Sequence, residues 1–134
     1  MIAFDTSVAV AAFASWHEAH AEAVARLARE PRLPAHVVVE TYSVLTRLPP
    51  PHRAAPAIVE AFLARTFPNA PLALPGGAQR ALVGVAVRHG FSGGAIYDLL
   101  VAATAKRARA RLLTRDRRAI PAYEAVGVDY ELLA

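Results

Sequence analysis

The chain opens with MIAFDTS (residues 1–7), and this stretch decides how the rest is interpreted. The apolar run before the first acid is typical of a short buried strand, and Asp5 ends it. Thr6 or Ser7 then caps a helix that we expect to run to about Phe13. A buried strand that passes directly into a helix favours an α/β fold with a parallel sheet.

Beyond this opening, the chain repeats the alternation of strands and helices. The run RLLT at residues 111–114 is the clearest later strand, and Asp116 follows it. Weaker strands are expected at residues 71–75 and 126–130. Helices are expected at residues 17–29, 35–48, 56–67, 78–89 and 95–109, with a helical turn at 117–123. The pattern predicts one domain over residues 1–134, a three-layer α/β/α sandwich around a mainly parallel central sheet.

Length and composition exclude several classes of protein. A chain of 134 residues, of which 55% are apolar, can build one substantial core. It contains no cysteine, which excludes a disulfide framework, a thiolate zinc site and a cysteine nucleophile. No apolar run approaches the roughly 20 residues that span a bilayer, and no basic segment precedes an apolar core at the N-terminus. We therefore expect a cytoplasmic protein without a membrane segment.

The basic residues are concentrated in one part of the chain. The formal net charge is +4, and every basic residue except Lys106 is Arg. A dense basic run extends from Lys106 to Arg118. Such a run is often only a solvated face, but this one surrounds Asp116. Because Arg binds phosphate through a planar fork, the run indicates a polyanionic substrate, with Arg115 and either Arg117 or Arg118 as candidate phosphate contacts.

Four acidic residues are placed where a parallel sheet would gather them at one edge. Asp5 and Asp116 follow strands, while Glu40 and Asp98 interrupt the apolar stripes of predicted helices. Ligands in open α/β folds bind beyond the carboxyl ends of the strands. Converging carboxylates repel each other, and a bound divalent cation is the simplest compensation. The four acids therefore predict the catalytic residues of a metal-dependent hydrolase.

Each of these acids also has a purely structural explanation. Asp5 could cap the following helix, and Asp98 could complement the positive end of its own helix. Glu40 could lie on an exposed helix face, and Asp116 could be a turn residue after a strand. Four such coincidences at one sheet edge are less plausible than one site.

Four motifs, in chain order, resemble those of the PIN-domain family. The first is FDTS at residues 4–7, and the second is VVET at residues 38–41, which contains Glu40. The third is YDLLVAATA at residues 97–105, an Asp followed by an Ala-rich helix. The fourth is LLTRD at residues 112–116, a strand that ends in Thr-x-Asp. The resemblance covers essentially the whole chain, and a stand-alone domain of this length is most similar to the VapC toxins of VapBC toxin–antitoxin pairs.

The resemblance implies an endoribonuclease toxin that hydrolyses RNA with Mg²⁺ or Mn²⁺, forms a homodimer and is inhibited by a cognate VapB-type antitoxin. Asp5 and Asp98 would be the principal metal ligands, and Asp116 would complete the site or hold a second ion. Glu40 would bind the metal through water or orient the attacking water. The hydroxyls of Thr6 and Thr114 are candidates for fixing carboxylate orientation, although simple backbone capping explains them equally well.

Three other classes of protein compete with this interpretation. A receiver-like phosphotransfer domain also gathers acids at the sheet edge, but it needs a Lys near the last strand, and Lys106 falls in a predicted helix. A haloacid-dehalogenase-type phosphatase needs Asp-x-Asp, whereas residues 5–7 are Asp-Thr-Ser. A non-catalytic RNA-binding module would keep the basic face without the acids, and it would be expected to expose aromatic stacking platforms.

Overall fold

The centre of the molecule is a parallel sheet, described by a computed structural model that covers residues 1–134. Its strands are β1 (Ile2–Phe4), β2 (Arg111–Thr114) and β3 (Tyr130–Leu132), in the order β1-β2-β3. Both strand pairs are parallel, with Ala3 opposite Leu112 and Leu113 opposite Glu131. The predicted parallel sheet is confirmed. β1 pairs directly with β2, although helices α1 to α6 lie between these strands in the sequence.

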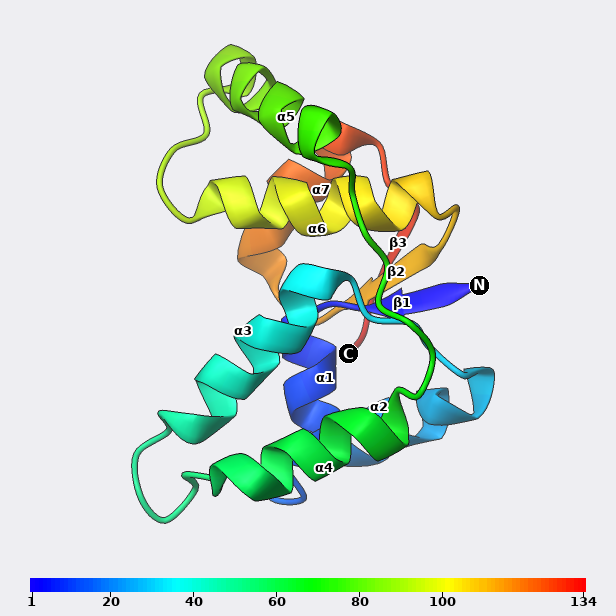
Figure 1. Ribbon diagram of the computed structural model, residues 1–134, viewed down its shortest axis with the longest axis vertical. Coiled ribbons are helices and arrows are strands. Elements are labelled where there is room, and N and C mark those ends of the chain that lie inside the picture. Colours follow the sequence, from blue (N-terminus) through cyan, green and yellow to red (C-terminus); the bar gives the residue numbers. More distant parts are fainter.

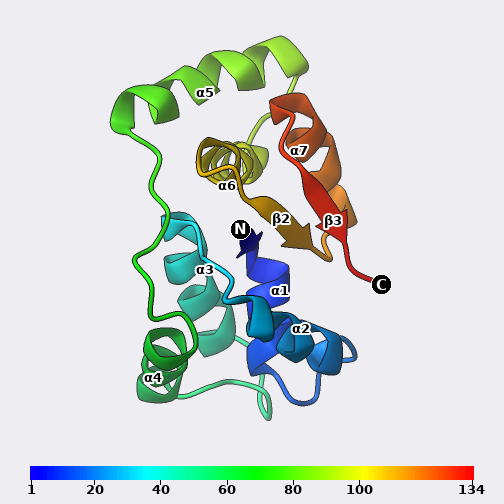
Figure 2. The same ribbon diagram turned by 90° about the vertical axis from the view of Figure 1, so that its right-hand side faces the viewer.

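Helices cover both faces of this sheet (Figures 1 and 2). One side carries four helices: α1 (Thr6–Phe13), α2 (His20–Arg26), α3 (Ala35–Thr46) and α4 (Pro56–Thr66). The other side carries three: α5 (Gly76–His89), α6 (Ala95–Arg107) and α7 (Ile120–Val126). Two short 3-10 turns, η1 (Leu27–Arg29) and η2 (Arg117–Ala119), follow α2 and precede α7. The predicted three-layer α/β arrangement is therefore confirmed.

The core forms where the sheet meets α1 and α6. Phe4 and Leu112 are completely buried in the sheet, and Val8 of α1 is buried against them. From α6, the small side chains Ala102 and Ala105 are also completely buried. Small residues on this face let the helix axis approach the sheet closely, which holds the beginning of α6 near the carboxyl ends of the strands.

The structure corrects two of the predicted strands. The last strand was expected at residues 126–130, but α7 continues to Val126 and β3 begins only at Tyr130. Gly127, with φ of 79°, ends the helix in the left-handed conformation that glycine adopts without strain. The strand expected at residues 71–75 is reduced to a single bridge between Leu72 and Pro34, because the prolines around it have no N–H to donate.

An extended segment that the sequence pattern does not indicate lies along the outer edge of β1. Arg32 forms a parallel bridge with Ala3, donating its N–H to the Ile2 carbonyl and accepting from the Phe4 N–H. The helix expected at residues 17–29 is also shorter at its start, since α2 begins only at His20. No helix combines the length and apolar character needed to cross a membrane.

Candidate active site

The four predicted acids line one small pocket. Asp5 follows β1, Asp116 follows β2, Glu40 comes from the middle of α3 and Asp98 from the first turn of α6. The pocket therefore lies at the carboxyl ends of β1 and β2, where parallel α/β folds bind their ligands. Folding thus brings together side chains from four separate elements.

Asp5 is the most deeply buried of the four acids, with 4% of its surface exposed. One carboxylate oxygen accepts hydrogen bonds from the Val8 N–H at 3.2 Å and from the Ser7 hydroxyl at 2.5 Å. The other oxygen accepts from the Tyr123 hydroxyl at 2.9 Å. Burial raises the pKa of Asp5, and hydrogen bonds from Ser7, Thr114 and Tyr123 partly offset this effect. Asp5 is therefore both the helix cap and a wall of the pocket.

Glu40 is fixed in place by a residue of the first motif. The Thr6 hydroxyl donates to one Glu40 carboxylate oxygen, which joins the beginning of α1 to the middle of α3. The other oxygen lies 3.4 Å from His36 Nε2, one helical turn earlier. His36 in turn stacks on Tyr97, with ring centroids 4.9 Å apart. These contacts hold α3 and the beginning of α6 on either side of the pocket.

Asp98 carries the clearest electrostatic signature of an acid cluster. Its pKa is raised to about 6, first by partial burial and then by the negative charges of Asp116, Glu40 and Asp5. Arg118 acts in the opposite direction and is outweighed. The protein alone therefore leaves the charges of this cluster incompletely compensated.

Asp116 is held by the chain that follows it. Its Oδ1 accepts from the backbone N–H of Arg118 at 3.0 Å, which caps the short turn η2. The Arg118 Nε lies 3.4 Å from the same oxygen. The backbone N–H of Asp116 donates to the buried hydroxyl of Thr114 at 3.0 Å. Thr114 therefore supports the backbone of Asp116. It also partly offsets the rise in the pKa of Asp5 that burial causes.

Ser7 and Tyr123 are site residues that sequence reasoning missed. Ser7 Oγ donates to Asp5 and accepts from the Arg115 backbone N–H at 2.8 Å, which joins the ends of β1 and β2. Tyr123 of α7 is almost completely buried, and burial together with Asp5 raises the pKa of its hydroxyl, which keeps it a donor. Ser7 stands in the FDTS motif and could have been noticed there, whereas nothing in the sequence pattern marks Tyr123.

The pocket does not contain a ready-made metal cage. No three His, Asp or Glu side chains are grouped so that they could hold a metal ion as they stand. Mg²⁺, however, is usually bound through one or two carboxylates and keeps several of its waters. The donors around the pocket are all oxygens, and the pKa of Asp98 is raised by burial and then by the neighbouring negative charges. The residues therefore fit a hydrated, oxygen-preferring cation and not a closed zinc-type cage.

A wider cleft of about 760 Å³ opens beside the acid pocket and shares Asp98, Asp116 and Glu40 with it. Arg115 and Arg118, two of the predicted RNA contacts, line this cleft, and so does Arg47 at the end of α3, which was not predicted. Arg117, the other predicted contact, is exposed and is not one of the residues lining the cleft. We refer to this space together with the acid pocket as the acid cleft.

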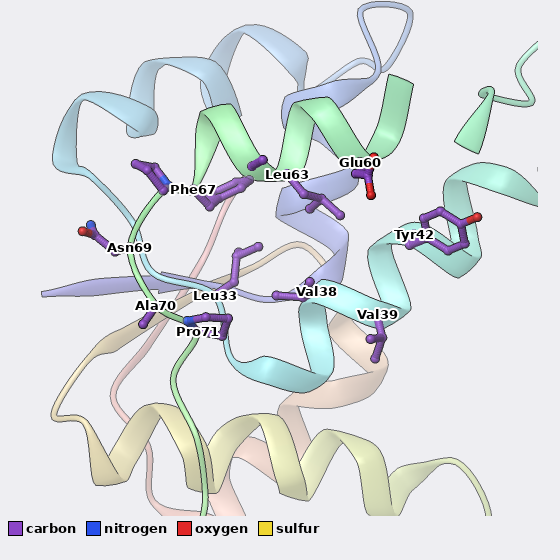
Figure 3. Close-up of a pocket in the computed structure, with 12 residues that line it drawn as sticks. Leu33, Val38, Val39, Tyr42, Glu60, Leu63, Phe67, Asn69, Ala70 and Pro71 are labelled. Atoms are coloured by element: carbon purple, nitrogen blue, oxygen red, sulfur yellow. The ribbon is translucent and has the colours of Figure 1, made fainter. Parts of the chain in front are cut away.

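A second pocket, of about 600 Å³, lies on another part of the molecule and is mostly apolar (Figure 3). Figure 3 shows side chains from α3, from α4 and from the segment after α4 around this pocket. They include Val38, Val39, Tyr42, Leu63 and Phe67. Glu60 supplies the one acidic side chain, and none of the four predicted acids takes part. We refer to this space as the apolar pocket.

Comparisons with known proteins show which family the chain belongs to. Residues 2–125 match the family model of the PIN domain. The chain is 55% identical to Ribonuclease VapC40 of Mycobacterium tuberculosis, strains CDC 1551 / Oshkosh and ATCC 25618 / H37Rv, over 133 residues and 99% of both chains. It is 46% identical to Ribonuclease VapC27 of strain H37Rv over 128 residues, which are 95% of this chain and 93% of the relative. The chain therefore belongs to the PIN-domain family, among its VapC-type members.

Proposed function

We propose that this protein is a VapC-type ribonuclease that hydrolyses RNA phosphodiester bonds in the acid cleft. The observation that carries the proposal is the convergence of Asp5, Glu40, Asp98 and Asp116, from four elements, on one pocket beside an arginine-lined cleft. The names of the relatives support the same reaction and substrate. An acid cluster next to cationic side chains suits phosphodiester hydrolysis, because the acids can bind a divalent metal and the cations can bind the phosphate.

Asp5 and Asp98 are the principal ligands that we propose for Mg²⁺ or Mn²⁺, with Asp116 completing the set. A bound divalent cation lowers the pKa of water and neutralises charge that develops on the phosphate. Ser7 and Tyr123 hold the Asp5 carboxylate in one orientation through hydrogen bonds of 2.5 and 2.9 Å. Supporting hydrogen bonds of this kind fix the direction in which a ligand presents its lone pairs.

Glu40 and the arginines of the cleft act on the reacting groups in this proposal. Glu40, held by Thr6, orients the attacking water toward the phosphorus atom and accepts its proton. Arg118 and Arg115 hold the phosphate oxygens so that the water lies in line with the leaving oxygen. The new bond joins the water oxygen to phosphorus while the bond to the ribose oxygen breaks, and the leaving ribose oxygen takes a proton from solvent water.

The proposed protein partners are a second copy of this chain and a cognate VapB-type antitoxin. We propose the apolar helices at residues 17–29 and 53–67 as the surfaces of the dimer contact. The second of these segments includes α4, which also forms one wall of the apolar pocket. An apolar surface is suited to protein contacts, whereas it offers little to a polyanion. A cytoplasmic location is part of the same proposal.

The competing receiver-like interpretation requires a lysine at the acid cluster. Lys106 donates instead to the Val126 carbonyl at 2.8 Å, at the far end of α6, and it does not line the acid pocket. The geometry therefore favours hydrolysis over phosphotransfer to an aspartate.

The proposal is tested with purified protein and total cellular RNA, with Mg²⁺ and with a chelator. Cleavage should require the metal, and Asp98→Asn should lower its rate by about a hundredfold or more. Glu60→Gln, which removes a carboxylate from the apolar pocket, is the matched control and should cleave like the parent protein. Undiminished cleavage by Asp98→Asn, or by the parent protein in excess chelator, would remove the acid cleft from the reaction.

A further inference from the structure

The turn between α1 and α2 presents an aromatic side chain next to the acid cleft. Trp16 is 49% exposed, which is unusual for the largest apolar side chain of a small domain. One face of its indole packs on His52, with ring centroids 4.1 Å apart and planes tilted by 31°. His52 belongs to the connection between α3 and α4, so two separate loops build this aromatic platform.

His17, the next residue, connects the platform to the acid cleft. Its side chain lines the cleft, and its ring centroid lies 5.9 Å from that of Trp16. His17 Nδ1 accepts the Ala19 N–H at 3.0 Å, so this nitrogen carries no proton and Nε2 carries the N–H of the neutral ring. Burial, followed by the charge of Arg115, lowers the pKa of His17 and keeps the ring neutral. The neutral ring therefore has its N–H at Nε2, and it lines the cleft next to Trp16.

Two arginines belong to segments that contribute to the platform or the cleft. Arg47, which lines the cleft, lies at the end of α3, and Arg53 follows His52 directly in the same connection. Both guanidinium groups are held in place, Arg47 by the Ser43 hydroxyl at 3.0 Å and Arg53 by the Leu48 carbonyl at 2.9 Å. Exposed aromatic rings and arginines are the side chains that proteins combine to bind single-stranded nucleic acid.

We propose that Trp16, supported from behind by His52, stacks on one unpaired base of the RNA while the phosphate next to that base enters the acid cleft past His17. This inference rests on the proposed ribonuclease function, since the strand must occupy the cleft. It adds a specificity determinant: the enzyme selects RNA segments whose bases are free to stack, and paired bases are rejected because their faces are covered. A protein partner would not explain why the platform is continuous with the acid cleft through His17.

Trp16 is the single tryptophan of the chain, so its fluorescence reports on the platform directly. The measurement uses the parent protein in chelator, which prevents cleavage, and short oligouridylate or oligoadenylate as the titrant. Either single strand should quench the fluorescence in a saturable manner, whereas the duplex of the two should not. Removing one base stack should weaken binding about tenfold, so this is the loss expected for Trp16→Leu by filter binding. Trp16→Phe should restore most of the affinity, which a purely apolar packing role would not require.

Cleavage kinetics separate this inference from the proposed function. Trp16→Leu should raise KM for a single-stranded substrate and leave kcat unchanged, while Val83→Ala, an exposed position on α5, should change neither.

If the parent protein cleaves RNA but RNA does not change its fluorescence, or if Trp16→Leu keeps the parental KM, the stacking site is refuted and the ribonuclease function stands. A Trp16→Leu variant that dimerises differently in sedimentation but binds RNA normally would assign the platform to a protein contact and refute the inference. If the parent protein neither binds nor cleaves RNA, the proposed function itself fails.

Discussion

The acid cleft and the apolar pocket lie against the same helix, and they differ in almost every other respect. Glu40 of α3 lines the acid cleft, while Val39 and Tyr42 of the same helix line the apolar pocket. The acid cleft gathers carboxylates that repel one another, whereas the apolar pocket is lined by side chains that gain free energy when they are buried. One region should therefore be tuned for reaction at a cost in stability, and the other should support the fold.

The sharpest test of this division is to remove one charge from the acid cleft. Asp98→Asn should lower the rate of RNA cleavage by about a hundredfold or more, because even residues that merely support metal ligands cost up to about that factor. Single-turnover cleavage of a labelled RNA measures the loss, and far-UV circular dichroism checks the fold. Glu60→Gln makes the same chemical change in the apolar pocket and should leave the rate unchanged. Equal effects of the two variants would abolish the distinction between the regions.

The reverse test is to remove a side chain from the apolar pocket. Phe67 is 9% exposed and packs edge-on against Phe4 and Phe62, with ring centroids 5.9 and 5.8 Å away. Phe67→Ala should lower the free energy of unfolding by about 3 kcal/mol, as expected for a large side chain lost from a core. Urea denaturation measures this loss, and Phe67→Leu should cost clearly less. Cleavage per folded molecule should be retained, so an enzyme that stays stable but loses activity would contradict the assignment.

Metal binding should stabilise the molecule through the acid cleft alone. When Mg²⁺ is about tenfold above its dissociation constant, the free energy of unfolding should rise by about 1.4 kcal/mol. Thermal unfolding with increasing Mg²⁺ gives the shift, and buffer with chelator and no added divalent cation gives the baseline. Asp98→Asn should lose most of the shift, while Glu60→Gln should keep it. A shift of the same size in Asp98→Asn would place the ion elsewhere.

The pH dependence of stability should also come from the acid cleft. The folded state holds the Asp98 proton more tightly than the unfolded state, since its pKa is raised from 3.8 to about 6. Stability without metal should therefore fall as the pH rises from about 4 to about 6, by about 1 kcal/mol after allowing for the partial exposure of the group. Asp5 contributes in the same direction, because its pKa is raised as well. Urea denaturation across this range should give a flatter profile for Asp98→Asn and an unchanged one for Glu60→Gln.

The smallest expected effect concerns the arginines that line the acid cleft. Arg118→Ala should weaken RNA binding a few-fold and reduce the slope of log affinity against log salt by about one. Arg88→Ala, an exposed position on α5 that does not line the cleft, removes the same charge and should leave the slope unchanged. Filter binding over a series of salt concentrations distinguishes the two, and identical slopes would remove Arg118 from the interface.

The parts of the fold that could be predicted are those that depend on local sequence. Strands β1 and β2 are short buried runs, each followed by an acid, so the sequence indicates both the strands and the acids at their ends. Proline and glycine also mark helix ends reliably here, as Pro56 and Gly90 do for α4 and α5. The last strand was misplaced because an apolar run at the end of α7 resembles the start of a strand, and only the backbone of Gly127 separates them.

The parts of the site that could not be predicted depend on contacts between distant segments. Tyr123 reaches Asp5 across 118 residues of chain, and no spacing rule connects them. Arg47 and Arg115 both line the cleft. Arg117 does not, although its neighbours Asp116 and Arg118 do. Which arginines face the cleft is decided by the short turn η2 and by the end of α3, and neither orientation is encoded by charge alone.

The Ser7 hydroxyl joins the two loops that carry Asp5 and Asp116. This hydroxyl receives the Arg115 N–H across 108 residues of chain and at the same time donates to Asp5. The two loops that supply Asp5 and Asp116 are thereby fastened together at one oxygen atom. A change to Ala would leave every charge in place, yet it would let the loops drift apart, and the enzyme would lose accuracy of alignment without losing any of its chemical groups.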